Sequence, residues 1–286
     1  MNNKSKKKNA KYIIFLISAA VVFAACVAVL IFSLFTGKVK ASDTVKLTSL
    51  TDEKSINLYA LGGLSCRAPE NTLPAFELAA KKGLSSVVFQ IKLTKDGVWV
   101  LSSDDTVNRM TDGSGKIADK TYFDLAEFTV DNGANYKKYE NLKILTLDNA
   151  LDACLENGLS PVIEVSENNG KALKKLSESV TSHGFGGSCT VISEDAEILK
   201  AVQSDEINAV YFAEKLDDKQ IDFCLDNPFD GVAFTADRKH NDSAKIKKLI
   251  SGGMQVFCFA DAEKKDFEYY VKAGVRNFVS GEIINE

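Results

Sequence analysis

Residues 72–101 read TLPAFELAAKKGLSSVVFQIKLTKDGVWVL, and they contain a helix pattern, a strand pattern and a tight turn in succession. Thr72 is a preferred cap residue and Pro74 suits a first helical turn, so we expect a helix to begin here with the Thr72 side chain as its cap. Apolar side chains recur at helical spacing from Phe76 onward, which predicts one buried face. Gly83 then predicts the end of this helix.

The second half of the same stretch predicts a strand that is followed by a hairpin. Residues Ser86–Leu93 are mostly apolar, and Asp96 with Gly97 forms a strong turn signal between two apolar runs. We therefore expect Trp99–Leu101 to fold back against the strand. A long polar segment, residues 104–145, then interrupts the pattern, and ordered insertions of this kind often serve function at the mouth of a barrel.

Strand-like and helix-like patterns alternate along the rest of the chain. The strand-like runs are Ile56–Leu61, Ser86–Leu93, Pro161–Val165, Thr190–Ser193, Ala209–Phe212, Gly231–Thr235, Gln255–Phe259 and Asn277–Ser280. The later helical patterns are Thr146–Asn157, Gly170–His183, Asp195–Val202, Asp218–Leu225, Asp242–Ile250 and Glu263–Ala273. This alternation predicts an α/β fold, a closed (β/α)₈ TIM barrel with a hairpin and loop insertion after its second strand. An open doubly wound sheet is the alternative, but no glycine-rich phosphate loop opens the first helix.

The N-terminal region predicts a membrane anchor. Residues 1–11 form a basic tail, and residues 12–35 carry no charge. As a helix with a rise of roughly 1.5 Å per residue, an uncharged segment of this length can cross a bilayer. Residues 36–55 read as a polar linker and residues 56–286 as the barrel. Because basic residues stay on the cytoplasmic side, we expect one transmembrane helix in the cell membrane, a cytoplasmic N-terminus and the barrel outside.

A cleaved signal peptide is the alternative to this anchor. Residues 39–41 could serve as a small-residue cleavage site, although the apolar segment before them is longer than the core of a usual signal peptide.

The charge of the chain bounds its partners. The net charge is −4, and the seven lysines of residues 1–40 leave −11 on the remainder. Such an acidic domain is repelled by nucleic acid and by anionic lipid, so we expect no nucleic-acid partner. The partners that remain are the membrane, through residues 12–35, and an unidentified ligand or protein outside it.

Several segments are similar to those of a known family. Residues 67–77 contain Pro-Glu-Asn-Thr, residues 93–100 contain the Asp-Gly hairpin, and residues 104–115 contain an arginine and Gly-Ser-Gly. Ile163 and Glu164 continue the match, and residues 274–280 resemble its last strand. The chain thus resembles the glycerophosphodiester phosphodiesterases, which are phospholipase C-like phosphodiesterases. The resemblance implies a (β/α)₈ barrel, in agreement with the strand count.

The same resemblance implies a specific chemistry at the mouth of the barrel. A divalent metal holds the phosphodiester, two histidines transfer protons, and an arginine and a lysine neutralise the phosphate. Leu61 and Ser103 stand at the histidine positions of this sequence, Gly62 at the arginine position and Ser166 at the lysine position. Val88, Gln90 and Glu164 stand at the metal-ligand positions, where Glu164 alone keeps its residue type.

These replacements predict a degenerate member of the family. A single carboxylate is a poor site for Ca²⁺ or Mg²⁺, and neither leucine nor serine transfers protons near pH 7 as imidazole does. We therefore expect a pseudoenzyme of the phosphoric diester hydrolase class, without a cofactor, that binds a ligand or a protein. Gln90, Asp104 and Glu164 are the candidate pocket residues.

Two other hypotheses remain open on the sequence. The first is an active phosphodiester hydrolase, acting on a glycerophosphodiester or a lipid headgroup through a rearranged metal site. The acids near predicted strand ends that could build such a site are Asp104, Asp105, Glu164, Asp237 and Asp261. The second is an architectural role in a membrane complex, which an exposed apolar patch on the outer helices would support.

Overall fold

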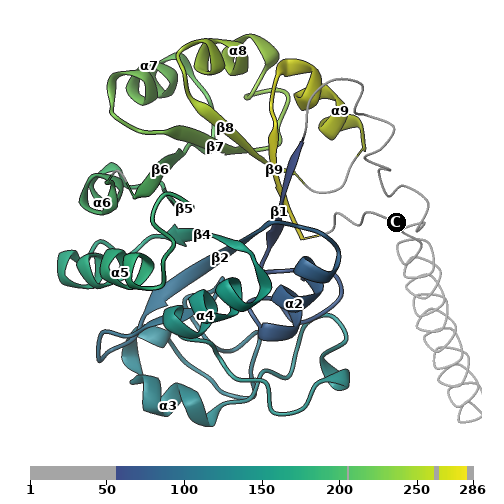
Figure 1. Ribbon diagram of the computed structural model, residues 1–286, viewed down its shortest axis with the longest axis vertical. Coiled ribbons are helices and arrows are strands. Elements are labelled where there is room, and N and C mark those ends of the chain that lie inside the picture. Colours follow the sequence, from purple (N-terminus) through teal and green to yellow (C-terminus); the bar gives the residue numbers. More distant parts are fainter. Residues whose placement is uncertain (1–55, 205, 261–263, 282–286) are drawn as a thin grey trace, which may run out of the picture. The chain divides into compact units, whose positions relative to one another are not determined.

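The computed structural model describes residues 56–204, 206–260 and 264–281. Eight parallel strands form one sheet, in which the first strand pairs with both the second and the last. These strands are β1 (Asn57–Leu61), β2 (Ser86–Leu93), β4 (Ser160–Val165), β5 (Cys189–Ser193), β6 (Ile207–Phe212), β7 (Gly231–Thr235), β8 (Gln255–Phe259) and β9 (Asn277–Ser280). The two β1 pairings close the sheet into a barrel, and β1 and β9 lie side by side in Figure 1. The predicted (β/α)₈ barrel is confirmed.

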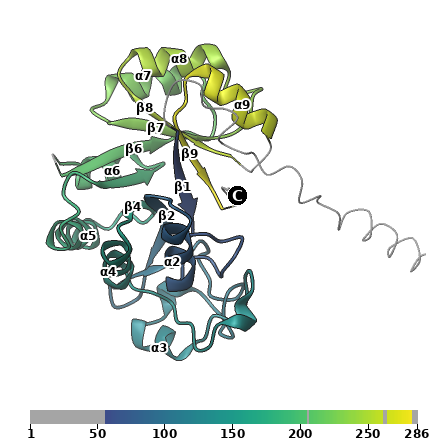
Figure 2. The same cartoon turned by 45° about the vertical axis from the view of Figure 1, so that its right-hand side comes forward.

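The helices connect successive strands and pack around the barrel (Figures 1 and 2). They are α2 (Leu73–Lys81), α4 (Leu147–Asn157), α5 (Gly170–Ser182), α6 (Ala196–Val202), α7 (Asp218–Asp226), α8 (Ser243–Ser251) and α9 (Lys264–Ala273). α2 begins with Pro74 in its first turn as predicted, but the Thr72 side chain does not cap it. The Thr72 hydroxyl instead donates to the Pro69 carbonyl oxygen at 2.6 Å. The predicted side-chain cap is therefore wrong, since the Thr72 hydroxyl is directed at the preceding turn and accepts no backbone N–H of α2.

Side chains point alternately to the two faces of each strand, so the core has one layer inside the barrel and one between the strands and the helices. On β2, Val87, Phe89 and Ile91 face the helices, and all three are buried in the cluster that α2, α4 and α5 cover. Val88 belongs to a separate apolar cluster inside the barrel. Since successive side chains on a strand point to opposite faces, Gln90 and Lys92 lie on the same inner side as Val88. The upper, polar part of β2 is thereby aimed into the barrel mouth.

The predicted hairpin and insertion are also present. β3 (Trp99–Leu101) pairs antiparallel with β2, and Trp99 Nε1 donates to the Ala172 carbonyl oxygen at 2.9 Å. The insertion contains the short helix α3 (Tyr122–Glu127), whose N-terminus has a reciprocal Thr121–Asp124 capping box. Asp96 in the hairpin turn accepts from the Tyr122 backbone N–H at 3.1 Å. This bond holds the insertion against the hairpin.

The tail, transmembrane helix and linker predicted for residues 1–11, 12–35 and 36–55 lie outside the described residues. Within the described part of the chain, none of the helices is both long and apolar enough to span a bilayer.

Candidate functional site

A pocket of about 650 Å³ opens at the carboxyl ends of β2, β4, β5 and β6. Its polar lining comes from Gln90 and Lys92 of β2, Glu164 of β4, and the residues that directly follow β4 and β5. The carboxyl ends of parallel strands converge at one face of a (β/α)₈ barrel, which is where such barrels place their sites. The fold thus brings together the predicted pocket residues Gln90 and Glu164 with Ser103 and Ser166, which stand at two of the family positions.

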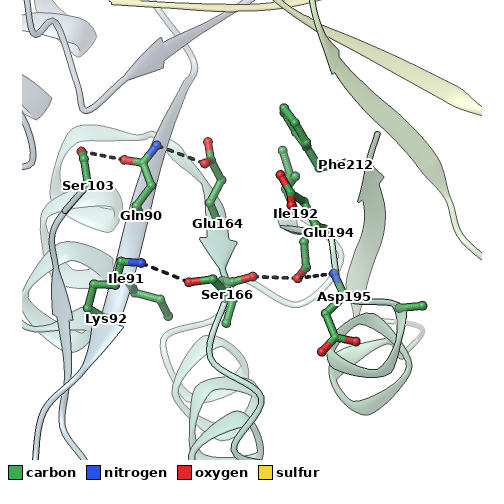
Figure 3. Close-up of a pocket in the computed structure, with 13 residues that line it drawn as sticks. Gln90, Ile91, Lys92, Ser103, Glu164, Ser166, Ile192, Glu194, Asp195 and Phe212 are labelled. Carbon is green, nitrogen blue, oxygen red and sulfur yellow. Dashed lines mark hydrogen bonds between the residues drawn. The ribbon is translucent and has the colours of Figure 1, made fainter. Parts of the chain in front are cut away.

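Gln90 is the centre of a chain of hydrogen bonds (Figure 3). Its Nε2 donates to Glu164 Oε2 at 3.1 Å, and its Oε1 accepts from the Ser103 hydroxyl at 3.1 Å. The Ser103 hydroxyl in turn accepts from Asn71 Nδ2 at 3.1 Å. Asn71 holds its place with a left-handed backbone, at φ 57°, in the loop before α2. Four side chains from four segments of the chain are therefore ordered as one polar row.

Glu164 ends this row with one oxygen unpaired. Its Oε1 is buried and has no hydrogen-bond partner among the described residues. Burial raises the pKa of the Glu164 carboxyl, and the nearby Glu194 carboxylate raises it further. The hydrogen bond from Gln90 and the charge of Lys92 oppose this shift without cancelling it. The pocket therefore offers a desolvated carboxyl oxygen that a bound hydroxyl group could satisfy.

Lys92 lies one inward-facing position beyond Gln90 on β2. Its ammonium group donates to the Ser166 hydroxyl at 3.1 Å, and its side chain is 15 % exposed. It forms an ion pair with Asp105 at 2.8 Å and lies 3.8 Å from Glu167. The Lys92 hydrogen bond and charge lower the pKa of the Asp105 carboxyl. Lys92 therefore joins the barrel wall to the insertion.

Asp104, a predicted pocket residue, is paired away from the pocket. Arg109 Nε lies 2.6 Å from Asp104 Oδ2, and Arg109 Nη2 lies 2.5 Å from Glu70 Oε1. The Glu70 hydrogen bond is the largest cause of a raised Arg109 pKa. Asp104 does not line the 650 Å³ pocket. The arginine instead connects the insertion to the loop that follows β1.

The other acids of the rearranged metal site do not converge. Asp105 pairs with Lys92, Asp237 hydrogen-bonds to His240 Nδ1 at 2.5 Å, and Asp261 lies outside the described residues. The structure has no group of three or more His, Cys, Asp or Glu side chains placed to hold a metal in residues 56–204, 206–260 and 264–281. The proposed rearranged site thus has no support in the described geometry.

The positions at which the resemblance implies a metal do not fit one. Val88 is fully buried in the apolar interior and offers no oxygen. Gln90 already uses its oxygen for Ser103 and its nitrogen for Glu164. Glu164 is left as the single carboxylate, whereas Ca²⁺ takes six to eight oxygen ligands and Mg²⁺ an octahedral set. These side chains form a hydrogen-bonded row rather than a cation site.

Leu61 and Gly62 are both constrained by the packing around them. Leu61 packs against the apolar cluster inside the barrel and lines a second pocket of about 320 Å³, beside Phe259 and Val279. Gly62 has φ +66°, and a Cβ there would lie 2.9 Å from Glu70 Cβ. A larger side chain at position 62 would therefore be strained.

The sequence did not predict three charged residues of the pocket, Lys92, Glu194 and Asp195. Lys92 follows Gln90 by two residues on one strand, so the alternation of side chains could have placed it in the mouth. Glu194 follows Ile192, an inward-facing residue of β5, in the same way. Asn71 gave no such signal, because its contact with Ser103 depends on a loop conformation.

A model of the glycerophosphoryl diester phosphodiesterase family matches residues 63–280. The chain belongs to that family. The match runs from the loop after β1 to the end of β9, so the predicted membership is confirmed.

Curated relatives share part of this sequence. The human glycerophosphodiester phosphodiesterase 1 is 36 % identical over 133 residues, which is 46 % of this chain and 40 % of the human protein. A putative glycerophosphodiester phosphodiesterase of Bacillus subtilis, YhdW, is 39 % identical over 95 residues, 33 % of this chain and 38 % of that protein. The matched part of the chain thus spans about two fifths of the length of these relatives.

Solved structures share the fold. A phosphodiesterase of Oleispira antarctica in complex with the product sn-glycerol-3-phosphate has a TM-score of 0.71 and 20 % identity, with 83 % of this chain and 97 % of that chain covered. A putative glycerophosphodiester phosphodiesterase of Galdieria sulphuraria has a TM-score of 0.69 and 17 % identity, with 82 % and 96 % covered. At this identity the likeness establishes the barrel alone.

The comparisons correct one prediction. The replacements in the sequence predicted a pseudoenzyme, that is, a family member that is not an enzyme. The relatives are named as glycerophosphodiester phosphodiesterases, which are enzymes, and no observation of this chain shows a loss of activity. The prediction was wrong because it treated residue replacements as evidence of lost activity.

Proposed function

We propose that the barrel binds a glycerophosphodiester, or the glycerol phosphate part of one, in the 650 Å³ pocket. Gln90 and Glu164 contact the glycerol hydroxyl groups in this proposal. The observation that carries it is the polar row that ends at the unpaired Glu164 Oε1. A buried oxygen without a partner is costly, and a hydroxyl donor from a ligand removes that cost. Family membership and the product named for the Oleispira antarctica structure support glycerol phosphate as the first ligand to test.

Binding is tested on the full-length chain, purified in detergent, by calorimetric titration with sn-glycerol-3-phosphate. The variant Gln90→Leu removes the amide that orients Glu164 and leaves the backbone unchanged. Loss of one such buried hydrogen-bonding group costs about 1–3 kcal/mol, so we expect binding weaker by about fivefold to a hundredfold. Leu155→Ala on the exposed surface of α4 is the matched control. Equal affinity of Gln90→Leu and the parent chain would refute this role of the row.

Hydrolysis of the bound diester is the second candidate, favoured by the names of the relatives. A water molecule would attack phosphorus and release a proton to solvent, the P–O ester bond would break, and the leaving oxygen would take a proton from an acidic group. Glu164 is a half-buried acid of the pocket with one buried carboxyl oxygen, and it is assigned this proton transfer. Release of product from glycerophosphodiesters is measured for the parent chain and for Glu164→Gln. Turnover that Glu164→Gln leaves unchanged would exclude the assignment.

We propose further that residues 12–35 hold the barrel on the outer side of the cell membrane. Support comes from the uncharged length of that segment and the basic residues before it. In cell fractionation, the full chain should sediment with membranes, and external protease should digest the barrel in intact spheroplasts. A chain that starts at residue 42 after expression, directly after the possible cleavage site at residues 39–41, would instead indicate cleavage.

A further inference from the structure

Two hollows of the barrel mouth meet at Lys92. The 650 Å³ pocket and a neighbouring cleft of about 820 Å³ share Lys92 and Ser166 in their linings. The cleft continues along the hairpin and the insertion, past Lys95 and Lys116. A ligand that extends from the pocket into the cleft therefore passes the Lys92 ammonium group.

Lys92 is the cation of the pocket. The described residues that line the pocket include three acids, Glu164, Glu194 and Asp195, and Lys92 as their one basic side chain. Its side chain is largely buried, and the Ser166 hydroxyl holds its ammonium in place (Figure 3). A partly buried ammonium makes stronger hydrogen bonds to an anion than an exposed one.

Lys92 has two carboxylate neighbours, Asp105 at 2.8 Å and Glu167 at 3.8 Å, and the nearer one is exposed. The Asp105 side chain is 81 % exposed and belongs to the insertion rather than to the barrel wall. Exposed carboxylates contribute little to an ion pair, because water competes for both groups. A phosphate group of a ligand offers three acceptor oxygens at the same place and can displace Asp105 from the ammonium.

We propose that Lys92 binds the phosphate of the ligand, and that Asp105 occupies the phosphate position when the ligand is absent. The inference rests on the proposed function and adds the group that recognises the charge. The inference also explains how the site can hold a cation although serine stands at position 166, the lysine position of the family pattern. The Lys92 ammonium reaches the Ser166 side chain from the neighbouring strand, so a cation is present at that level of the mouth without a lysine on β4.

The first test compares charge variants of the full-length chain by titration with sn-glycerol-3-phosphate. Lys92→Met should weaken binding by about tenfold to a hundredfold, because hydrogen bonds to charged groups contribute about 1.5–3 kcal/mol. Lys175→Met on the exposed face of α5 removes the same charge and should leave the affinity unchanged. Asp105→Asn removes the competing carboxylate and should tighten binding severalfold.

The second test moves the charge between strands. The double variant Lys92→Ser with Ser166→Lys exchanges two side chains that touch at 3.1 Å, and it should recover most of the affinity that Lys92→Ser alone loses. Ser166→Lys alone, which adds a second cation beside Lys92, is the control for an effect of the new lysine by itself. Thermal melting of each variant checks that the barrel is folded.

The outcomes separate this inference from the proposed function. Binding that Gln90→Leu weakens but Lys92→Met and Asp105→Asn do not change would overturn the inference and leave the proposed function standing. A parent chain that binds neither sn-glycerol-3-phosphate nor inorganic phosphate would overturn both.

Discussion

Gln90 and Glu164 are aligned partners on β2 and β4, and the Gln90 amide donates to the Glu164 carboxyl at 3.1 Å. The two residues are 74 positions apart in the chain. Parallel register places their side chains at the same height inside the barrel, above the apolar pair Val88 and Val162. On these two strands, the inward-facing side chains therefore change from apolar to polar at the level of Gln90 and Glu164.

The first prediction concerns Glu164 and pH. Burial raises the pKa of the Glu164 carboxyl above its ordinary value of 4.5, so the folded chain holds this proton more tightly than the unfolded chain does. The contribution to stability is then present below the unfolded pKa and is lost as pH rises through the folded pKa. Glutamine at position 164 does not titrate, so the Glu164→Gln variant does not lose this stability as pH rises. Above the folded pKa of Glu164, the variant should therefore have a larger free energy of unfolding than the parent chain.

The measurement is the free energy of unfolding in urea, taken for both proteins from pH 4 to pH 9. The difference between variant and parent should grow as pH rises, since all other titrating groups are common to both. A constant difference across the whole range would show that the Glu164 pKa is not raised.

A second prediction uses two glycines that have the same backbone angle. Gly63 and Gly83 both have φ +79°. A Cβ on Gly63 would lie 2.6 Å from the Ala75 carbonyl carbon, whereas a Cβ on Gly83 meets nothing within 4 Å. Alanine at either position should cost about 1–3 kcal/mol through the left-handed backbone, and Gly63→Ala should cost more because backbone atoms of α2 must also move.

Urea unfolding of the two alanine variants isolates the close approach, because the backbone cost is matched. Equal destabilisation of both variants would mean that β1 and α2 can separate without cost at this point.

The third prediction concerns Arg109, which bridges Asp104 and Glu70. Arg109→Met should lower the free energy of unfolding by about 1 kcal/mol, because the three side chains are partly exposed and solvent screens their pairs. The larger effect should be local, with faster protease cleavage within residues 104–145.

Lys200→Met is the control for Arg109→Met, since it removes an exposed pair with Glu197 on α6. Cleavage of the insertion at the same rate in both variants would show that Arg109 does not hold it.

A fourth prediction concerns removal of divalent metal. Glu164 is the single carboxylate of the family's metal positions, and Gln90 already donates to it. We therefore expect binding of sn-glycerol-3-phosphate to persist in excess EDTA, with a change in affinity of less than about twofold. Loss of binding on chelation, with recovery on addition of Ca²⁺ or Mg²⁺, would reverse this view of the site.

The barrel could be predicted from the sequence because strands and turns leave patterns within a few neighbouring residues. Four strands, Ser86–Leu93, Gly231–Thr235, Gln255–Phe259 and Asn277–Ser280, have the predicted bounds. Apolar runs beside glycine and polar turns report strands directly, and an Asp-Gly turn reports a hairpin. The site residues Gln90, Ser103, Glu164 and Ser166 were placed by strand ends and by the family resemblance. Their partners were not, and Asp104 was assigned to the pocket although Arg109 holds it outside.

By itself, the sequence determined which residues form strands, which side chains alternate inward, and which positions hold leucine, valine or serine. Only the tertiary structure decided that Gln90 orients Glu164, that Lys92 reaches Ser166, and that Asp105 covers Lys92. The physical reason is register. A shift of one residue between β2 and β4 would turn every inward side chain of one strand to the opposite face, and no local pattern records which register two distant strands adopt.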